Sequence, residues 1–229
     1  MLLALLTLLP PTPILIFSKT AGFRHDSIPV AIQTLQSLAP DHNLTITATE
    51  DANQFSPDNL KKFRAVIFLS TTGDILNPEQ EQAFEAYIKQ GGGFVGIHAA
   101  ADTEYNWPFY GELVGAYFKS HPHIQKATIN VIDQAHPSTT HLPTKWSRTD
   151  EWYCYKSLPP TTARILAKLD PNTYQGSTMG ENHPIAWCQT IAKGRSWYTG
   201  GGHTKESFAE PEFRQHLIGG ILWAAGIKN

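Results

Sequence analysis

Short apolar runs alternate with amphipathic segments along the first hundred residues. The runs at 14–17, 65–70 and 94–97 are almost entirely apolar, which is typical of strands buried on both faces of a parallel sheet. Residues 44–49 instead alternate apolar and polar positions, as a strand with one exposed face does. These patterns predict four strands in this part of the chain.

Helical patterns separate these strands. Residues 27–38 carry apolar side chains three and four positions apart, and Asp26 stands where an N-cap is expected. Residues 57–63 and 78–90 both start with proline, which favours the first turn of a helix. Strands and helices alternating at this spacing predict an α/β protein with a doubly wound, mostly parallel sheet flanked by helices.

The pattern is less regular from about residue 107 to residue 169, where we predict an antiparallel or irregular extension. The elements expected in the second half are strands at 126–133, 163–170, 184–189 and 195–199 and a closing helix at 211–225. A hairpin-like turn joins the last two of these strands.

Composition indicates one folded domain. The chain has 229 residues, of which 41% are hydrophobic and 17% charged, so disorder and coiled coil are excluded. We expect a single domain over residues 14–226. Residues 1–13 precede it as an apolar extension or a leader, because the run at 1–9 has the length of a signal-peptide core and is too short to span a bilayer. Localisation therefore stays open between cytoplasmic and secreted.

Charge and cysteine content limit the partners. Eighteen basic and twenty acidic residues leave a formal charge of −2 without any run of like charge, which argues against nucleic acid as a partner and favours a small ligand. Cys154 and Cys188 lack the spacing of a metal or redox motif, and either two buried thiols or one disulfide fits them. The oligomeric state is open, a homo-oligomer included.

Polar residues follow four of the predicted strands. They lie at 22–26, 71–74, 98–102 and 200–203. Because ligands of open α/β sheets lie outside the carboxyl ends of the strands, we expect these loops to meet at one pocket. The glycines at 200–202 lack a following Lys-Ser/Thr pair, so nucleotide binding is not indicated.

The strand at 94–97 leads into a turn that resembles a nucleophile elbow. Gly96, Ile97 and His98 are followed by three alanines, which allow a tight bend. In amidotransferases of this kind the elbow residue is a cysteine that carries a thioester. A histidine can act as a base, an acid or a metal ligand but does not replace that thiolate. Glutaminase chemistry is therefore disfavoured.

The candidate site residues come from these loops and from a pair of acids beside aromatic residues, a combination common in carbohydrate sites. The catalytic candidates are His98, Asp102, His25 and His203. The substrate-binding candidates are Arg24, Asp74, Trp107, Asp150, Glu151 and Trp152. For each there is a structural alternative: a hydrogen-bonded histidine, a helix-start carboxylate, a core tryptophan or a surface ion pair.

Ten histidines also raise the question of a metal. His121 and His123 form an H-x-H pair, and His136 and His183 adjoin proline, but the spacing matches no established zinc motif. We therefore predict no cofactor, with a divalent metal such as zinc as the alternative.

Five separated motifs resemble the trehalose-utilisation (ThuA-like) domain family. They are KTAGFRH (19–25), GGFVGIHAAAD (92–102), DEWY (150–153), PIAW (184–187) and GRSWYTGGGH (194–203). The resemblance covers nearly the whole chain. It implies a flavodoxin-like fold of the class I glutamine amidotransferase-like superfamily without the amidotransferase cysteine. It also implies a role in the metabolism of trehalose, related disaccharides or their 3-keto derivatives.

Two functions of different classes follow. In the first, a histidine-centred pocket carries out proton transfer on a sugar, in an isomerisation or a hydrolysis. In the second, the domain binds a carbohydrate or a partner without catalysis, on a scaffold that has lost its nucleophile. The two differ in whether His98, His25, His203 and Asp102 share one pocket with Glu151 or Asp150.

Overall fold

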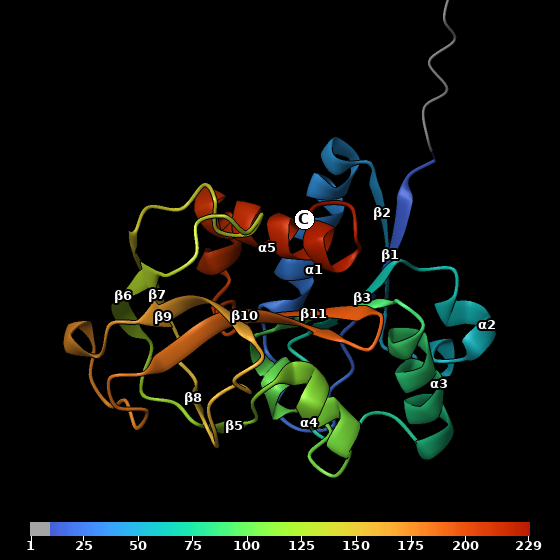
Figure 1. The fold of residues 1–229 in the computed structure, drawn as a ribbon, viewed down its shortest axis with the longest axis horizontal. Helices are drawn as coiled ribbons and strands as arrows, with labels where there is room; N and C mark the ends of the chain where they lie inside the picture. The colour runs from blue at the N-terminus through green and yellow to red at the C-terminus, as the bar shows by residue number, and fades with distance from the viewer. Residues whose placement is uncertain (1–9) are drawn as a thin grey trace, which may run out of the picture.

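The computed structural model describes residues 10–229, and the apolar run at 1–9 lies outside the described residues. The described chain builds one large mixed sheet (Figure 1). In spatial order its strands are β2 (Leu44–Thr49), β1 (Thr12–Phe17), β3 (Ala65–Leu69), β4 (Gly93–Ile97), β11 (Gly194–Thr199), β10 (His183–Ile191), β9 (Arg164–Leu169), β6 (Gln125–Val131) and β7 (Lys145–Asp150). A second, two-stranded sheet pairs β5 (Phe118–Ser120) with β8 (Cys154–Tyr155).

The first five strands in this order run parallel and have the flavodoxin-like arrangement. Strands β3 and β4 are buried along their whole length, as their continuous apolar runs predict. The α-helices are α1 (Ile28–Leu38), α2 (Pro57–Leu60), α3 (Pro78–Lys89), α4 (Pro108–Val114) and α5 (Pro211–Ala224). Figure 1 shows α1 and α5 on one face of the sheet and α3 and α4 on the other. Short 3-10 turns lie at Ala39–His42, Ala52–Gln54, His98–Asp102, Pro171–Thr173 and Glu206–Ala209.

The predicted extension is part of the same sheet. Strands β10, β9, β6 and β7 continue it in antiparallel fashion from β11. The expected strands and hairpin are present, but α4, β5, β7 and β8 were not predicted. In β7 the buried positions include Arg148 and Asp150. Because charged residues occupy its inner face, this strand lacks the apolar alternation that identifies a strand in sequence.

Two local predictions are decided by side-chain contacts. The predicted N-cap Asp26 does not cap α1, because its carboxylate pairs with Lys205 at 2.7 Å and Ser27 takes the N-cap position.

Cys154 and Cys188 are both free and buried, so they form no disulfide. Burial raises the pKa of the Cys188 thiol to about 12, which keeps it protonated and unreactive.

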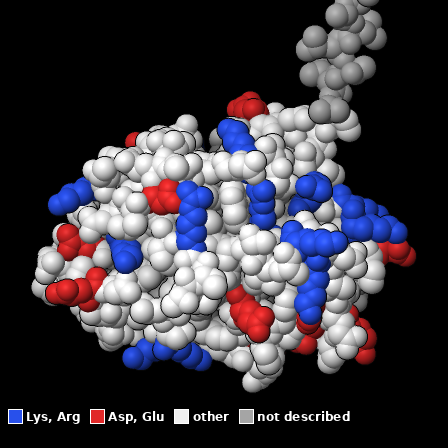
Figure 2. Space-filling view, in the orientation of Figure 1, with Lys and Arg blue, Asp and Glu red and all other residues white. Residues whose placement is uncertain are grey.

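On the surface, Lys and Arg side chains occur together with Asp and Glu across the face shown in Figure 2. Among the described residues, no helix is both long and apolar enough to cross a membrane.

The fold is expected to lose stability on mild acidification because of two buried histidines, His216 in α5 and His136, which packs against Trp223 of the same helix. The pKa of His216 is lowered to about 3 and that of His136 to about 4, in both cases mainly by burial. In the unfolded chain both groups take up a proton near the ordinary pKa of 6.5, so stability is complete above that pH and falls below it. Each contributes about 1.4 kcal/mol per pH unit in this window.

These two histidines should together lower the free energy of unfolding by about 2 kcal/mol between pH 6 and pH 5, measured by urea denaturation. Buried His25, whose pKa is also about 3, adds to this fall. Glutamine at position 216 can still donate to Ser138 O and accept from the Thr199 hydroxyl, the two contacts of His216. His216→Gln should therefore stay folded, and its free energy of unfolding should fall by about 1 kcal/mol less over the same pH range. An unchanged slope in this variant would contradict the assignment.

Candidate functional site

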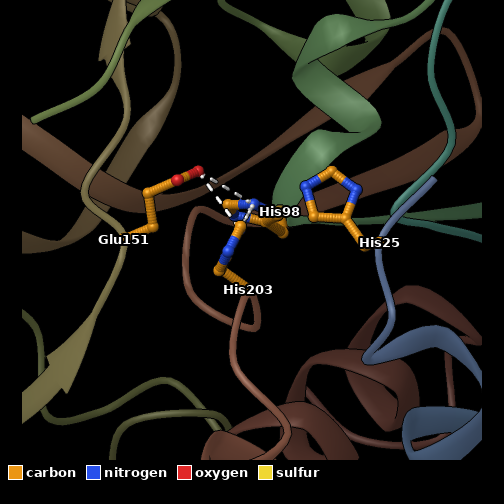
Figure 3. A group of neighbouring side chains, drawn as sticks. All are labelled: His25, His98, Glu151 and His203. Carbon is orange, nitrogen blue, oxygen red and sulfur yellow. Dashed lines mark hydrogen bonds and ion pairs between the residues drawn. The ribbon is translucent and has the colours of Figure 1, made fainter. Parts of the chain in front are cut away.

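Three parallel strands each bring a histidine to the carboxyl edge of the sheet. His25 lies in the loop after β1, His98 directly follows β4, and His203 lies in the loop after β11. Glu151 joins them from the end of β7, in the antiparallel half. One nitrogen or oxygen atom from each of the four side chains lies within 4.8 Å of all the others (Figure 3). We call this set the histidine–glutamate cluster.

His98 has the backbone geometry of an elbow. Its φ is 50°, a left-handed conformation that is uncommon outside glycine and that is found at functional turns. The three alanines that follow are fully buried, so the tight turn packs without space for larger side chains. The His98 ring is fixed by Nδ1, which donates to Gly200 O at 3.0 Å. In the neutral ring, Nε2 therefore presents a lone pair to the cluster.

Glu151 contacts three imidazoles although it is only 5% exposed. Its Oε2 lies 3.2 Å from His203 Nδ1 and 3.5 Å from His98 Nε2. Its Oε1 lies 3.0 Å from Nδ1 of His121, a side chain that is 44% exposed. Burial alone would raise the pKa of Glu151, but the hydrogen bond and charge of His203 hold it well below its usual range, and His98 adds to this when its ring is protonated. Glu151 is therefore a carboxylate at neutral pH.

The two remaining imidazoles differ in their electrostatics. Burial, with smaller contributions from the charges of His98 and His203, lowers the pKa of His25 to about 3, so this ring is neutral. Nδ1 of His25 is buried and has no hydrogen-bond partner among the described residues. For His203, burial lowers the pKa, but the hydrogen bond and charge of Glu151 outweigh burial and raise it. The site thus combines a neutral ring at His25, a carboxylate at Glu151 and a ring at His203 whose protonated form that carboxylate stabilises.

The sequence motifs and the fold lead to one family. Residues 13–224 match the family model named ThuA and described as trehalose utilisation. The chain belongs to the ThuA family. Membership implies a role related to trehalose utilisation. No curated protein matches the chain.

Solved structures agree with this assignment at the level of the fold. A ThuA-like protein from Bacteroides uniformis superimposes with a TM-score of 0.80 at 23% identity, over 94% of this chain and 91% of that chain. A second, from Parabacteroides merdae, gives 0.79 at 21% identity, over 95% and 91%. A β-galactosidase from Bacillus circulans sp. alkalophilus gives 0.62 at 15% identity, over 96% of this chain and 32% of that enzyme. At these identities the likenesses show the fold alone.

In this ThuA domain Asp150 binds the loop that carries His203. It is fully buried, and its carboxylate accepts hydrogen bonds from the backbone N–H groups of Gly202 (2.8 Å) and His203 (3.1 Å). Arg148 Nη1 pairs with the same carboxylate at 2.9 Å. A Cβ on Gly201 would lie 2.5 Å from Arg148 Nη1, so this close approach requires glycine. The glycine loop thus surrounds an anion of the protein itself, and Asp150 positions His203.

The other polar candidates lie outside the histidine–glutamate cluster of the ThuA domain. The Asp102 carboxylate accepts from the Tyr105 hydroxyl at 2.6 Å. Arg24 forms an ion pair with Glu50 at 2.6 Å, with both side chains about half exposed. Asp74 is exposed. Any contact of these residues with a substrate remains a prediction.

The two candidate tryptophans are packed in the core. Trp107 is 7% exposed and stacks on Tyr110 at a centroid distance of 6.0 Å. Trp152 is fully buried, and its indole N–H donates to Gln125 O at 2.9 Å. Both rings have the environment of core residues, which is the structural alternative to a platform for a sugar.

Sequence reasoning did not place His121 in the ThuA site. The H-x-H pair with His123 attracted attention as a metal motif, yet no sequence spacing connects either residue with Glu151. The contact depends on β5 and β8, the small sheet that brings residue 121 beside residue 151. Only the pairing of these two unpredicted strands reveals it.

Proposed function

We propose that this ThuA-family protein is an enzyme of carbohydrate metabolism that transfers protons on a disaccharide or its keto derivative. The observation that carries the proposal is the histidine–glutamate cluster at the carboxyl edge of the parallel strands. Four ionisable side chains meet there within 4.8 Å, and three of them are buried. Burial of such groups is costly, and their convergence is typical of sites that handle protons or charge.

The carboxylates of the site favour proton transfer beside a carbonyl over glycoside hydrolysis. Most glycosidases use two carboxyl groups on opposite sides of the scissile bond. Glu151 is the one carboxylate of the cluster, since Asp150 is bound by Arg148 and the glycine loop and Asp102 by Tyr105. Enolisation of a keto sugar needs one base and donors for the developing oxyanion, which a carboxylate with several imidazoles supplies.

Two imidazole–carboxylate pairs reach solvent and are the proposed proton carriers. His121 faces Oε1 of Glu151 and is 44% exposed, and His203 faces Oε2 and is 21% exposed. In the proposed step, a base of this kind removes the proton from the carbon next to the ketone. The electron pair moves onto the ketone oxygen, which gives an enediolate. The hydroxyl proton on the first carbon then passes to that oxygen, and the abstracted proton returns to the former carbonyl carbon, so the first carbon becomes the ketone. The substrate and product are then isomers.

NMR spectroscopy in deuterated water tests the proposal. Purified protein is incubated with trehalose, other disaccharides and their 3-keto forms, and we expect deuterium to enter the carbon next to the ketone. His203→Gln should slow this exchange by at least about 100-fold. His123→Gln is the matched control, because it removes an exposed imidazole near the site and should leave the rate unchanged.

Two other results would overturn the proposal in different ways. Release of free monosaccharide without exchange would establish hydrolysis instead of enolisation. Saturable line broadening by one sugar without any turnover would establish a non-catalytic binding domain.

A further inference from the structure

We infer that His25, His98, His203 and Glu151 together bind one divalent transition-metal ion. Three imidazole nitrogens and one carboxylate oxygen are a donor set that suits ions such as Zn²⁺, Mn²⁺ or Fe²⁺. Ca²⁺ and Mg²⁺ prefer oxygen ligands throughout, and the cluster offers a single carboxylate. Three of the ligand residues are buried and His203 is half-buried, which limits competition from water.

The distances between the ligand atoms have the size that a small ion requires. Metal–nitrogen distances of 2.0–2.1 Å place the corners of a tetrahedron about 3.3 Å apart. His98 Nε2 lies 3.2 Å from His203 Nδ1, and Glu151 Oε2 lies 3.2 Å from His203 Nδ1 and 3.5 Å from His98 Nε2. These three atoms form a nearly equilateral triangle of this size. The ligand atom of His25 lies within 4.8 Å of all three and completes the set.

Hydrogen bonding does not satisfy these atoms by itself. His98 uses Nδ1 to donate to Gly200 O, so its neutral ring has an acceptor at Nε2. Glu151 Oε2 is also an acceptor, and both atoms face His203 Nδ1. One proton on His203 therefore serves two acceptors, so these three atoms carry more lone pairs than hydrogens. A cation would be attracted by all of these lone pairs at once.

The surroundings of the ligands are those of a preorganised metal site. Ligand histidines commonly donate their second N–H to a carbonyl, which fixes the tautomer, and Gly200 O plays this part for His98. Asp150 binds the backbone N–H of His203 and sets the position of that loop. His121 contacts Oε1 of Glu151, so the carboxylate presents Oε2 to the other ligands.

The role of the ion rests on the proposed function, whereas its binding does not. A bound ion would polarise the ketone of the sugar and stabilise the negative charge on that oxygen as the adjacent carbon loses its proton. With Oε2 of Glu151 and His203 facing the ion, His121 is the group left to accept this proton. The proton then passes from His121 to the former carbonyl carbon while the hydroxyl proton moves from one oxygen to the other, and no other reactant is needed.

Metal binding can be measured without any substrate. The full-length protein is stripped with EDTA and titrated with Zn²⁺ by calorimetry and with Co²⁺ by visible absorption. We expect one ion per chain and the intense d–d bands of four-coordinate Co²⁺. His98→Gln and Glu151→Gln should each weaken binding by at least about 100-fold. Circular dichroism of each variant shows whether it is folded, and His25→Gln provides a third ligand variant.

His123 serves as the control. His123→Gln removes an exposed imidazole outside the ligand set and should bind Zn²⁺ like the unaltered protein. Equal binding by the His98→Gln variant, or no saturable binding by the unaltered protein, would overturn the metal site. Turnover that survives EDTA in such a protein would leave the proposed function intact. A protein that binds one ion but turns over no sugar would retain the metal site and refute the proposed function.

Discussion

Replacing Glu151 by glutamine is expected to lower the turnover of a keto-disaccharide by roughly 10²–10⁴-fold. Glutamine has the size of glutamate and can still accept a hydrogen bond from His203 Nδ1, so the change removes chiefly the negative charge. That charge is the one carboxylate among the four residues of the cluster. Both proposed proton carriers, His121 and His203, contact it directly. The measurement is the initial rate of deuterium incorporation, followed by NMR.

A second carboxylate variant controls for nonspecific effects. Glu206 is exposed and lies in the 3-10 turn shortly after His203, so Glu206→Gln should retain the full rate. A Glu151→Gln variant that is folded and keeps its rate within tenfold of the unaltered protein would show that this carboxylate is not needed for the chemistry.

Replacing Asp150 by asparagine is expected to destabilise the fold by about 3 kcal/mol. The carboxylate is fully buried and pairs with Arg148, whose side chain is 2% exposed. Asparagine would leave the guanidinium with one partner, Glu210, whose side chain is 28% exposed. The N–H groups of Gly202 and His203 would also lose their charged acceptor. For a chain of this length, the melting temperature should fall by roughly 6–12 °C.

Glu210→Gln is the matched control, because it removes the outer partner of the same arginine. Since this partner is accessible to water, the variant should cost less than about 1 kcal/mol. Calorimetric melting curves of both variants check the prediction. A melting temperature for Asp150→Asn within 2 °C of the unaltered protein would mean that the pair with Arg148 contributes little to stability.

Much of the parallel half could be predicted because its signals are local. Continuous apolar runs marked β1, β3 and β4, and capping residues marked α3. The rule that ligands bind at the carboxyl ends of parallel strands brought His25, His98 and His203 together in advance. It depends only on strand direction, which the alternation of strands and helices determines.

The antiparallel half was harder because its side chains serve contacts that are distant in sequence. Strand β7 has charged residues on its inner face, since Arg148 and Asp150 pair with each other and with the loop after β11. Such a strand carries no apolar alternation. Asp150 was predicted to contact substrate because it stands beside aromatic residues in the motif 150–153; in the structure its buried carboxylate contacts Arg148 and the loop after β11.

The amino-acid sequence by itself therefore determined the fold class, the family and the three histidines of the site, because periodicity and motifs depend on residues that are close together in the sequence. Only the tertiary structure showed that Glu151 contacts His98 and His203, that Asp150 binds the loop of His203 and that His121 contacts Glu151. These contacts join segments 50 or more residues apart in several cases, such as Asp150 with Gly202. Their geometry is set by strand pairing across the sheet, which no local pattern encodes.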